Sequence, residues 1–448
     1  MKPYSFVLPE SFHPGEFLTS PALLCRWDDA RYFVSLILTK LARGQVDDGG
    51  MIRLRAAYLR NVMHNRGCKP VVDALLEGGA VWRTAYKVGE KSFGYRLSDR
   101  FIGDRHVRLP ISNARLIGRL AVFHEQQEVE RLARMQPVHL ALAKQQHRLR
   151  IHGDAAREIV AGLPPKSNPF DVQGVLVANI EHREFHCNVG RYGRLANNIT
   201  SLKREVRETL HVGGRKLGSV DLSCVQPALL GKIIRDSTPS TDSKHGTNGD
   251  RENGERTGTG AEQASIYDAQ PDGWDGATGL DLERYCSAAQ AGTFYEIMVA
   301  ELSANGIGRE EFKRRFLADV IAKRKANRHG AEYPSVVEDT FRRLFPSVYR
   351  FIRQVNRDGW EHKKLIRQLQ RGESALVIET VAADLVTRFP STFFLTLHDA
   401  IYTTDEHLCK VEQAFRRAFD QTGFPMQFKV GHGSSSRGSH VTTRKGEA

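Results

Sequence analysis

The stretch LTLHDAIYTT, residues 395–404, consists of two alternating apolar runs that are interrupted once, by His398 and Asp399. Alternation with a period of two is typical of strands, so the stretch predicts a hairpin with the His-Asp pair in its turn. A turn at a strand end is exposed, and its polar side chains can reach a ligand. Because Asp is also common in ordinary turns, Asp399 indicates a functional site only if a second carboxylate lies beside it.

Asp221 is the candidate for that second carboxylate. The preceding run KLGSV predicts a buried strand that ends at Asp221, and a helix is expected from about Cys224, with Pro227 in its first turn. If the two strands are neighbours in one sheet, Asp221 and Asp399 can share divalent metal, since Mg²⁺ takes hard oxygen ligands. Two Mg²⁺ ions would stabilise the attacking and the leaving oxygen of a phosphoryl displacement. We therefore expect both aspartates to be catalytic metal ligands in nucleotidyl transfer.

The overall charge fits a polyanionic partner. The 448 residues include 65 Lys and Arg against 52 Asp and Glu, a net charge of +13, which favours nucleic acid or an anionic membrane surface. No apolar run reaches the roughly 18 residues of a membrane-spanning helix, and the N-terminus lacks the apolar core of a signal peptide. We therefore expect a cytoplasmic protein with no membrane partner. The six cysteines are widely separated and predict neither a disulfide framework nor a zinc site.

Residues 1–110 predict a winged helix-turn-helix domain. Its expected elements are helices over residues 29–44, 55–63 and 69–79 and an alternating hairpin over residues 80–99. Such a domain would place its second short helix in a groove of nucleic acid and its hairpin wing, with Lys87 and Lys91, on phosphates. The same pattern also fits a structural cap or a protein-interaction domain that binds no nucleic acid.

Beyond this domain, residues 111–184 predict a helical connector. Residues 235–279 are rich in Gly, Ser, Thr and Asp and nearly free of aliphatic side chains, so they cannot bury enough apolar surface to become ordered. Apolar patterning returns on both sides of them, which indicates a disordered insertion inside a domain. The last residues, 433–448, are similarly polar and predict a flexible tail.

In their order along the chain, several segments resemble the motifs of family A DNA polymerases. DLSCVQPALL, which begins at Asp221, looks like the first palm motif, and LHDAI, with His398 and Asp399, looks like the third. Residues 193–195 are similar to the Gly-Arg-Leu segment that precedes the first motif in that family. The resemblance supports the metal-binding role of the two aspartates and implies nucleic-acid contacts for Arg194 and His398.

Two helical segments complete the resemblance. In REEFKRRFL, Arg309 and Lys313 have the Arg-x-x-x-Lys spacing of the fingers helix that holds the incoming triphosphate. A spacing of four places both cations on one face of a helix, where they can meet the same phosphate chain. LQRGESALVIETVAADLV is similar to the Gln-containing helix that precedes the His-Asp hairpin, which implies a nucleic-acid contact for Gln370.

The resemblance implies an α+β fold. Behind the winged helix-turn-helix, residues 185–432 would form a polymerase-like palm, an antiparallel sheet with helices, together with helical fingers. The implied activity is that of a template-dependent nucleotidyltransferase with two Mg²⁺ ions, whose partners are a DNA primer-template and nucleoside triphosphates. Replication or repair of a phage or mobile element would suit this pairing of domains, with replication proteins as further partners.

Five positions depart from the family's pattern. Ile321-Ala322 stands in place of a Tyr-Gly pair and Leu317 in place of an aromatic residue, which alters the base-stacking surface. Gln226 occupies the place of a Glu that blocks the ribose 2′-hydroxyl, so a nucleotide contact with weakened sugar selectivity is expected there. Ala400 replaces a Glu of the DNA enzymes, and the related single-subunit RNA polymerases also lack an acid at this place.

These departures leave two alternatives to a DNA polymerase. One is a single-subunit RNA polymerase or primase, which Gln226 and Ala400 allow. The other is a catalytically inactive, DNA-binding replication initiator or regulator. Retention of Asp221, Asp399 and Lys313 argues against an inactive palm.

Overall fold

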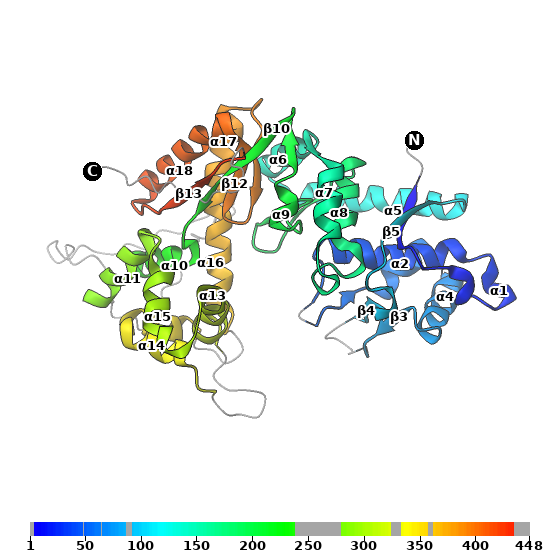
Figure 1. Ribbon diagram of the computed structural model, residues 1–448, viewed down its shortest axis with the longest axis horizontal. Coiled ribbons are helices and arrows are strands. Elements are labelled where there is room, and N and C mark those ends of the chain that lie inside the picture. Colours follow the sequence, from blue (N-terminus) through cyan, green and yellow to red (C-terminus); the bar gives the residue numbers. More distant parts are fainter. Residues whose placement is uncertain are drawn as a thin grey trace, which may run out of the picture. The chain divides into compact units, whose positions relative to one another are not determined.

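The structure is a computed structural model and describes residues 4–47, 49–63, 65–86, 92–237, 279–323, 333–356 and 362–433. Lys87, Lys91, most of the predicted insertion (238–278) and the tail after Gly433 lie outside these residues. The chain divides into two compact units. The first contains Met1–Val189 and Leu195–Leu217, and the second contains Gly190–Arg194 and Gly218–Ala448. Both units combine helices with antiparallel strands (Figure 1), which confirms the predicted α+β class.

The first unit contains the helices and the hairpin that the sequence predicts for its N-terminal part. They are α2 (Trp27–Ala42), α3 (Ala56–Met63), α4 (Asn65–Glu77), β3 (Val81–Arg83) and β4 (Gly94–Leu97). Strand β2 (Ile52–Arg53) pairs with β4, so the hairpin becomes a sheet in the order β2-β4-β3. Helix α2 packs on this sheet, where the ring of Phe33 meets Tyr95 edge-on with centroids 5.1 Å apart. Its identification as a winged helix-turn-helix stays a prediction.

The remaining elements of the first unit surround this part. They are β1 (Ser5–Pro9), α1 (Pro21–Leu24), β5 (His106–Pro110), α5 (Ala114–Ala133), α6 (Pro137–Gln146), β6 (Leu149–Ile151), α7 (Gly153–Ala161), α8 (Val172–Glu181), β7 (Cys187–Val189), β8 (Leu195–Asn197), α9 (Arg204–Arg207) and β9 (Leu210–Val212). Strand β1 pairs with β5, β6 with β9, and β7 with β8, all antiparallel. Strand β6 lies within the segment 111–184 that the sequence predicts to be helical. A strand this short does not stand out against the helical patterns on both sides of it.

The sheet of the second unit is built around β10 (Arg215–Leu222), of which Gly218–Leu222 belongs to this unit. Strand β10 is hydrogen-bonded to both β12 (Ala400–Thr404) and β13 (Phe428–Gly431), and β11 (Leu395–Leu397) pairs with β12. Leu397 faces Ala400 in the register, so His398 and Asp399 form the two-residue turn of a hairpin, as predicted. Helix α18 (Leu408–Thr422) and the π-helical segment η8 (Ala375–Ala382) pack on these strands (Figure 1).

The rest of the described second unit is largely helical. Its elements are α10 (Val225–Asp236), α11 (Leu280–Gln290), α12 (Phe294–Leu302), α13 (Arg309–Arg315), the π-helical η7 (Phe316–Ile321), α14 (Val336–Leu344), α15 (Pro346–Val355), α16 (Lys364–Ser374) and α17 (Ala383–Arg388). An aromatic cluster holds α11 to α15 together. The ring of Phe294 is fully buried and lies within 6.2 Å, centroid to centroid, of Tyr285, Phe312, Phe316, Phe341 and Phe345.

Removing the ring of Phe294 should destabilise the chain. We expect Phe294→Ala to lower the free energy of unfolding by about 3–5 kcal/mol, because it leaves a cavity among five rings that cannot all close on it. Urea unfolding followed by circular dichroism measures the change. Leu317→Ala is the control, since this side chain of η7 is 37% exposed. A loss for Phe294→Ala no larger than that for the control would contradict this account of the core.

Candidate functional site

The two predicted aspartates are carried by neighbouring strands of the second unit. In β10 the side chains alternate, so Val220 and Leu222 are buried while Asp221 between them is exposed. The backbone N–H of Leu222 donates a hydrogen bond of 3.2 Å to the carbonyl oxygen of Asp399. His398, exposed in the turn, has a left-handed backbone with φ of 53°, which lets the chain reverse within two residues. The hairpin turn therefore meets the end of β10 beside Asp221.

A lysine that the sequence analysis did not single out lies opposite Asp221. In the register of β10 and β13, Asp221 faces Lys429, and both side chains are exposed. Directly opposed residues of an antiparallel pair lie on the same face of the sheet with Cβ atoms about 5 Å apart. Lys429 is thus a cation of the same surface as Asp221. Lys429 lies opposite Asp221 only because β13 pairs with the distant strand β10, so no local sequence pattern indicates that the two residues are neighbours.

Asp399 lies in a partly buried and electropositive environment. Burial raises the pKa of its carboxyl group, and a backbone hydrogen bond and the positive charges of His398, Arg194 and Lys313 oppose this rise. Arg194 and Lys313 are far apart in sequence, and the charges of both lower the pKa of the Asp399 carboxyl group.

Arg194 is held in place by a buried glutamate. Its Nη2 atom lies 2.7 Å from Oε1 of Glu373, a residue that is only 2% exposed. Burial raises the pKa of Glu373, while Arg194 and a hydrogen bond from Gln226 lower it and the charge of Asp399 raises it further. The Gln226 bond is long, with 3.4 Å between Nε2 and Oε2 of Glu373. Glu373 thus links two predicted site residues, Arg194 and Gln226, and lies near a third, Asp399.

The loop that carries Arg194 requires a glycine. Gly193 has a φ of +82°, and its N–H donates to the carbonyl of Gly190 at 3.0 Å, which closes a tight turn. A Cβ atom at Gly193 would lie 3.2 Å from Nη1 of Arg371 and 3.3 Å from Cβ of Ser374, two residues of α16. The turn therefore rests directly on α16, and this contact aims Arg194 at Glu373 of the same helix.

Arg309 and Lys313 share one aromatic ring. The guanidinium of Arg309 lies 5.4 Å and the ammonium of Lys313 5.5 Å from the ring centroid of Tyr295. Each cation also has a carboxylate partner, Glu296 at 3.1 Å for Arg309 and Glu310 at 3.2 Å for Lys313. The predicted same-face arrangement of the two cations is thus present, and a ring supports both.

Tyr295 connects this cationic pair to the aspartates. Burial raises the pKa of the Tyr295 hydroxyl, and the charges of Cys224 and Asp399 contribute to the rise. The charge of Asp399 thus acts on the same residue whose ring supports the cations of α13. The sequence analysis missed Tyr295, because an aromatic residue in the first turn of an apolar helix is indistinguishable from a core residue.

Glu373, in contrast, has a sequence signal that can be recognised. Leu365, Leu369 and Val377 repeat at intervals of four or eight on the buried face of the helix, and Glu373 occupies the same row. A single carboxylate in an apolar row indicates a buried, paired charge. Gln370 lies outside this row and is partly exposed, and its predicted contact with nucleic acid stays a prediction.

The fit of these residues to Mg²⁺ can be judged from the donors they offer. Asp221 and Asp399 supply carboxylate oxygens, which is the ligand type that Mg²⁺ prefers. Among the described residues, no group of three or more His, Cys, Asp or Glu side chains is placed to hold a metal ion. A pair of carboxylates suits an ion that takes its other ligands from water and from substrate phosphates. The donor set fits Mg²⁺ bound together with a nucleotide.

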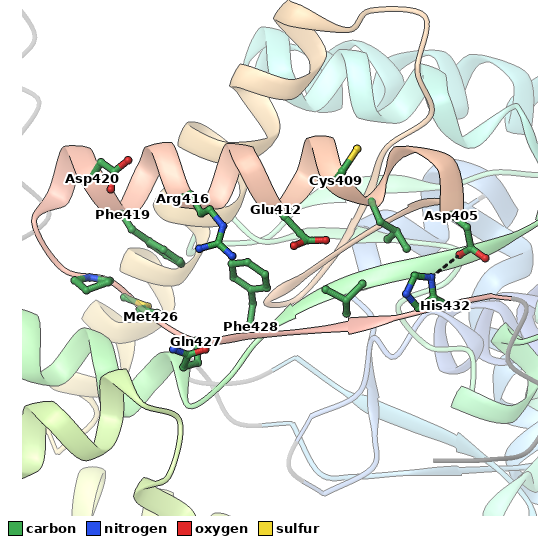
Figure 2. Close-up of a pocket in the computed structure, with 13 residues that line it drawn as sticks. Asp405, Cys409, Glu412, Arg416, Phe419, Asp420, Met426, Gln427, Phe428 and His432 are labelled. Carbon is green, nitrogen blue, oxygen red and sulfur yellow. Dashed lines mark ion pairs between the residues drawn. The ribbon is translucent and has the colours of Figure 1, made fainter. Parts of the chain in front are cut away.

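A pocket elsewhere in the second unit contains none of these residues. It lies between α18 and β13, has a volume of about 590 Å³, and includes the ion pair of Asp405 with His432 (Figure 2). On its floor Phe428 stacks on Phe415 with centroids 6.2 Å apart, and the guanidinium of Arg416 lies over the Phe428 ring. The candidate site is therefore an open surface around the hairpin turn and is distinct from this pocket.

The buried carboxylate of Glu373 should make stability depend on pH. Because its folded pKa is raised, the folded chain keeps a proton that the unfolded chain releases in the window between the two pKa values. The native chain loses stability as the pH rises through this window, and Glu373→Gln removes that loss. In urea unfolding from about pH 4 to pH 8, the free energy of unfolding of the variant should increase relative to that of the native chain. At higher pH the difference between the two should become constant.

The control for this prediction is Glu379→Gln, which removes a carboxylate that binds Arg371 with Oε1 2.7 Å from Nη1. It tests whether any lost carboxylate of this helical region has the same effect. A stability difference between Glu373→Gln and the native chain that stays constant over the whole pH range would contradict the raised pKa.

Comparison with solved structures gives a likeness in fold. No protein-family model matches the chain, and no curated protein matches it. The POL domain of Pol1 from M. smegmatis, solved in complex with DNA primer-template and dNTP, is similar with a TM-score of 0.33 and 12% identity, over 88% of this chain and 80% of that chain. That domain is a family A DNA polymerase, the family whose motifs the sequence resembles. No helix in the described residues is long and apolar enough to span a membrane.

Proposed function

We propose that the second unit is a template-dependent nucleotidyltransferase of the DNA polymerase type, which acts in replication or repair. The observation that carries the proposal is the convergence around Asp399. Its backbone lies against β10 beside Asp221, and Arg194 and Lys313 are close enough to influence its pKa. Carboxylates for metal next to cations for phosphate are the combination that phosphoryl transfer requires, since its transition state spreads negative charge over phosphate oxygens.

The role that each residue would have follows from its position. Asp221 and Asp399 would hold two Mg²⁺ ions, which when bound supply charge stabilisation at the attacking and leaving oxygens. Arg309 and Lys313 would bind the triphosphate and exchange their present partners, Glu296 and Glu310, for phosphate oxygens. Such an exchange is favourable because ion pairs at the surface contribute little, whereas charge-assisted hydrogen bonds to phosphate are strong. Tyr295 keeps both cations on one side during the exchange.

Arg194 and Gln226 would face the nucleic acid and the nucleotide. The ion pair with Glu373 fixes where Arg194 points, whereas Gln226 is held to the same glutamate by one long hydrogen bond. In a polymerase, a fixed donor such as Arg194 can contact the primer terminus without a further ordering cost, and Gln226 would meet the sugar less rigidly. The exposed turn residue His398 would contact the nucleic acid in the same region.

In the first unit, we propose that α2 to β4 act as a winged helix-turn-helix that binds nucleic acid. The helices and the antiparallel hairpin are present in the predicted order. The sequence from 51 to 105 carries eleven Lys and Arg against five Asp and Glu, a local net charge of +6. This excess favours a polyanionic partner and supports nucleic acid over a protein-interaction role.

A single-subunit RNA polymerase or primase is the second candidate. Gln226 and Ala400 favour it, because neither position carries the acid of the DNA enzymes. Ile321, which stands where those enzymes have an aromatic residue, is 1% exposed and so cannot stack on a sugar or base from its present position. The two candidates share the metal site and the triphosphate site and differ only in the choice of sugar.

Loss of either aspartate should abolish catalysis without abolishing binding. We expect Asp221→Asn and Asp399→Asn to remove nucleotide incorporation on a primed DNA template with Mg²⁺, because each change removes charge needed for metal and for the transition state. Gel-shift affinity for the same template should change little, since phosphate contacts remain. Asp420→Asn, an exposed aspartate at the end of α18, is the matched control. Near-native incorporation by either site variant would rule out the site. Native incorporation by Asp420→Asn would show that the loss of any aspartate is not sufficient to abolish activity.

The sugar selectivity of the enzyme should be weak. Gln226 is held by one long hydrogen bond and lacks an exposed aromatic partner, so it should discriminate poorly at the 2′ position. We expect dATP and ATP to be incorporated within about two orders of magnitude of each other, or roughly 3 kcal/mol. Single-nucleotide incorporation kinetics on one template measure the ratio. A preference of about ten-thousandfold or more would show that another residue selects the sugar.

The variant Lys313→Ala should reduce the incorporation of dATP and of ATP by the same factor, because Lys313 would contact the triphosphate and not the sugar.

A further inference from the structure

A tryptophan is exposed on the outer face of the sheet β2-β4-β3. Strand β3 alternates, so Val81 is 2% exposed and faces the core, whereas Trp82 is 55% exposed on the opposite face. Tryptophan dominates the energetics of cores and interfaces because of its large apolar area, so an exposed one on a regular strand has a cost in solubility. The ring is presented by a paired strand, so its position is well defined.

An arginine extends the surface of this ring. Arg96 is the direct cross-strand partner of Trp82, and its guanidinium carbon lies 5.9 Å from the ring centroid. The Arg96 side chain is 43% exposed and is also bound by Asp99 at 2.9 Å. A guanidinium beside an indole gives a planar, cationic surface of the kind on which nucleobases stack.

A second aromatic residue is exposed further along the same arm of the hairpin. Tyr86 is 53% exposed, and its ring contacts Phe93 of the other arm with centroids 5.3 Å apart. The guanidinium of Arg83 lies 4.8 Å from the centroid of Phe93. By the alternation of β3, however, Arg83 lies on the face of Val81 and not on that of Trp82, so Tyr86 adds an exposed ring to the hairpin while the platform itself consists of Trp82 and Arg96.

We propose that Trp82 and Arg96 form a stacking platform for single-stranded nucleic acid. The local net charge of +6 over residues 51–105 favours a polyanion over an apolar protein surface. A ring that stacks needs a base whose face is free, which a duplex does not offer, so the platform selects single strands. This inference is separate from the proposed catalytic site, and it assigns to the hairpin a role other than contact with duplex phosphates.

The first test measures binding to a single strand and to a duplex without nucleotides. The probes are a fluorescent oligo-dT of about 20 nucleotides, an oligo-U of the same length, and a duplex of the same length, each titrated with the full chain. We expect Trp82→Ala to weaken binding to the single strands by about 5- to 150-fold and to leave duplex affinity within about twofold. Trp82→Phe should restore much of the loss, since it keeps a stacking face. The oligo-dT and oligo-U arms separate DNA from RNA as the source of the bases.

The matched control is Val129→Ala. Val129 is another exposed apolar residue of the first unit, 64% exposed, and it belongs to α5, outside the segment from α2 to β4. It offers no ring for stacking, so its loss should leave all affinities unchanged. Equal weakening of single-strand and duplex binding by Trp82→Ala, or no weakening of either, overturns the platform. Primer extension on a duplex template reports separately on the proposed function, because it depends on Asp221 and Asp399.

Discussion

One backbone hydrogen bond, from the N–H of Leu222 to the carbonyl of Asp399, joins the two parts of the chain on which the site depends. It fixes the hairpin turn at the end of β10, where the side chain that alternates outward is Asp221. A shift of the hairpin by one residue would turn every side chain of β12 to the opposite face. The buried residues Ile401 and Thr403 on that strand oppose such a shift, so the core of the sheet also sets the separation of the two carboxylates.

The second unit contains a buried carboxylate that is paired with an arginine, and a separate pair of cations at its surface. Glu373 is almost fully buried and is compensated by Arg194, whose positive charge also lowers the pKa of Asp399. A buried charge without its partner is costly, so the pair has to form when the unit folds. The cations of α13 are treated differently. They lie at the surface over Tyr295, where they can change partners without a large desolvation cost.

Local patterns predicted the elements of the site, and long-range contacts decided which residues meet. The hairpin at His398 and Asp399 could be predicted because alternation and turn chemistry act over a few residues. The pairing of β10 with β13 and the contact of Arg194 with Glu373, 179 residues apart, depend on the tertiary fold, which no local pattern encodes. The nucleic-acid contact of Gln370 stays a prediction, whereas Glu373, which the motif comparison did not single out, follows the apolar row of the helix and binds Arg194.

The turn at Gly193 has a consequence for the connectivity of the protein. The residues Gly190–Arg194 belong to the second unit, but both flanking strands, β7 and β8, belong to the first. The second unit is therefore not encoded by one continuous stretch of sequence. A fragment that begins at Gly218 would lack the loop that covers α16 and would leave Glu373 buried without its cation. Any separation of the two units, by proteolysis or by gene rearrangement in evolution, has to keep this short loop with the second unit.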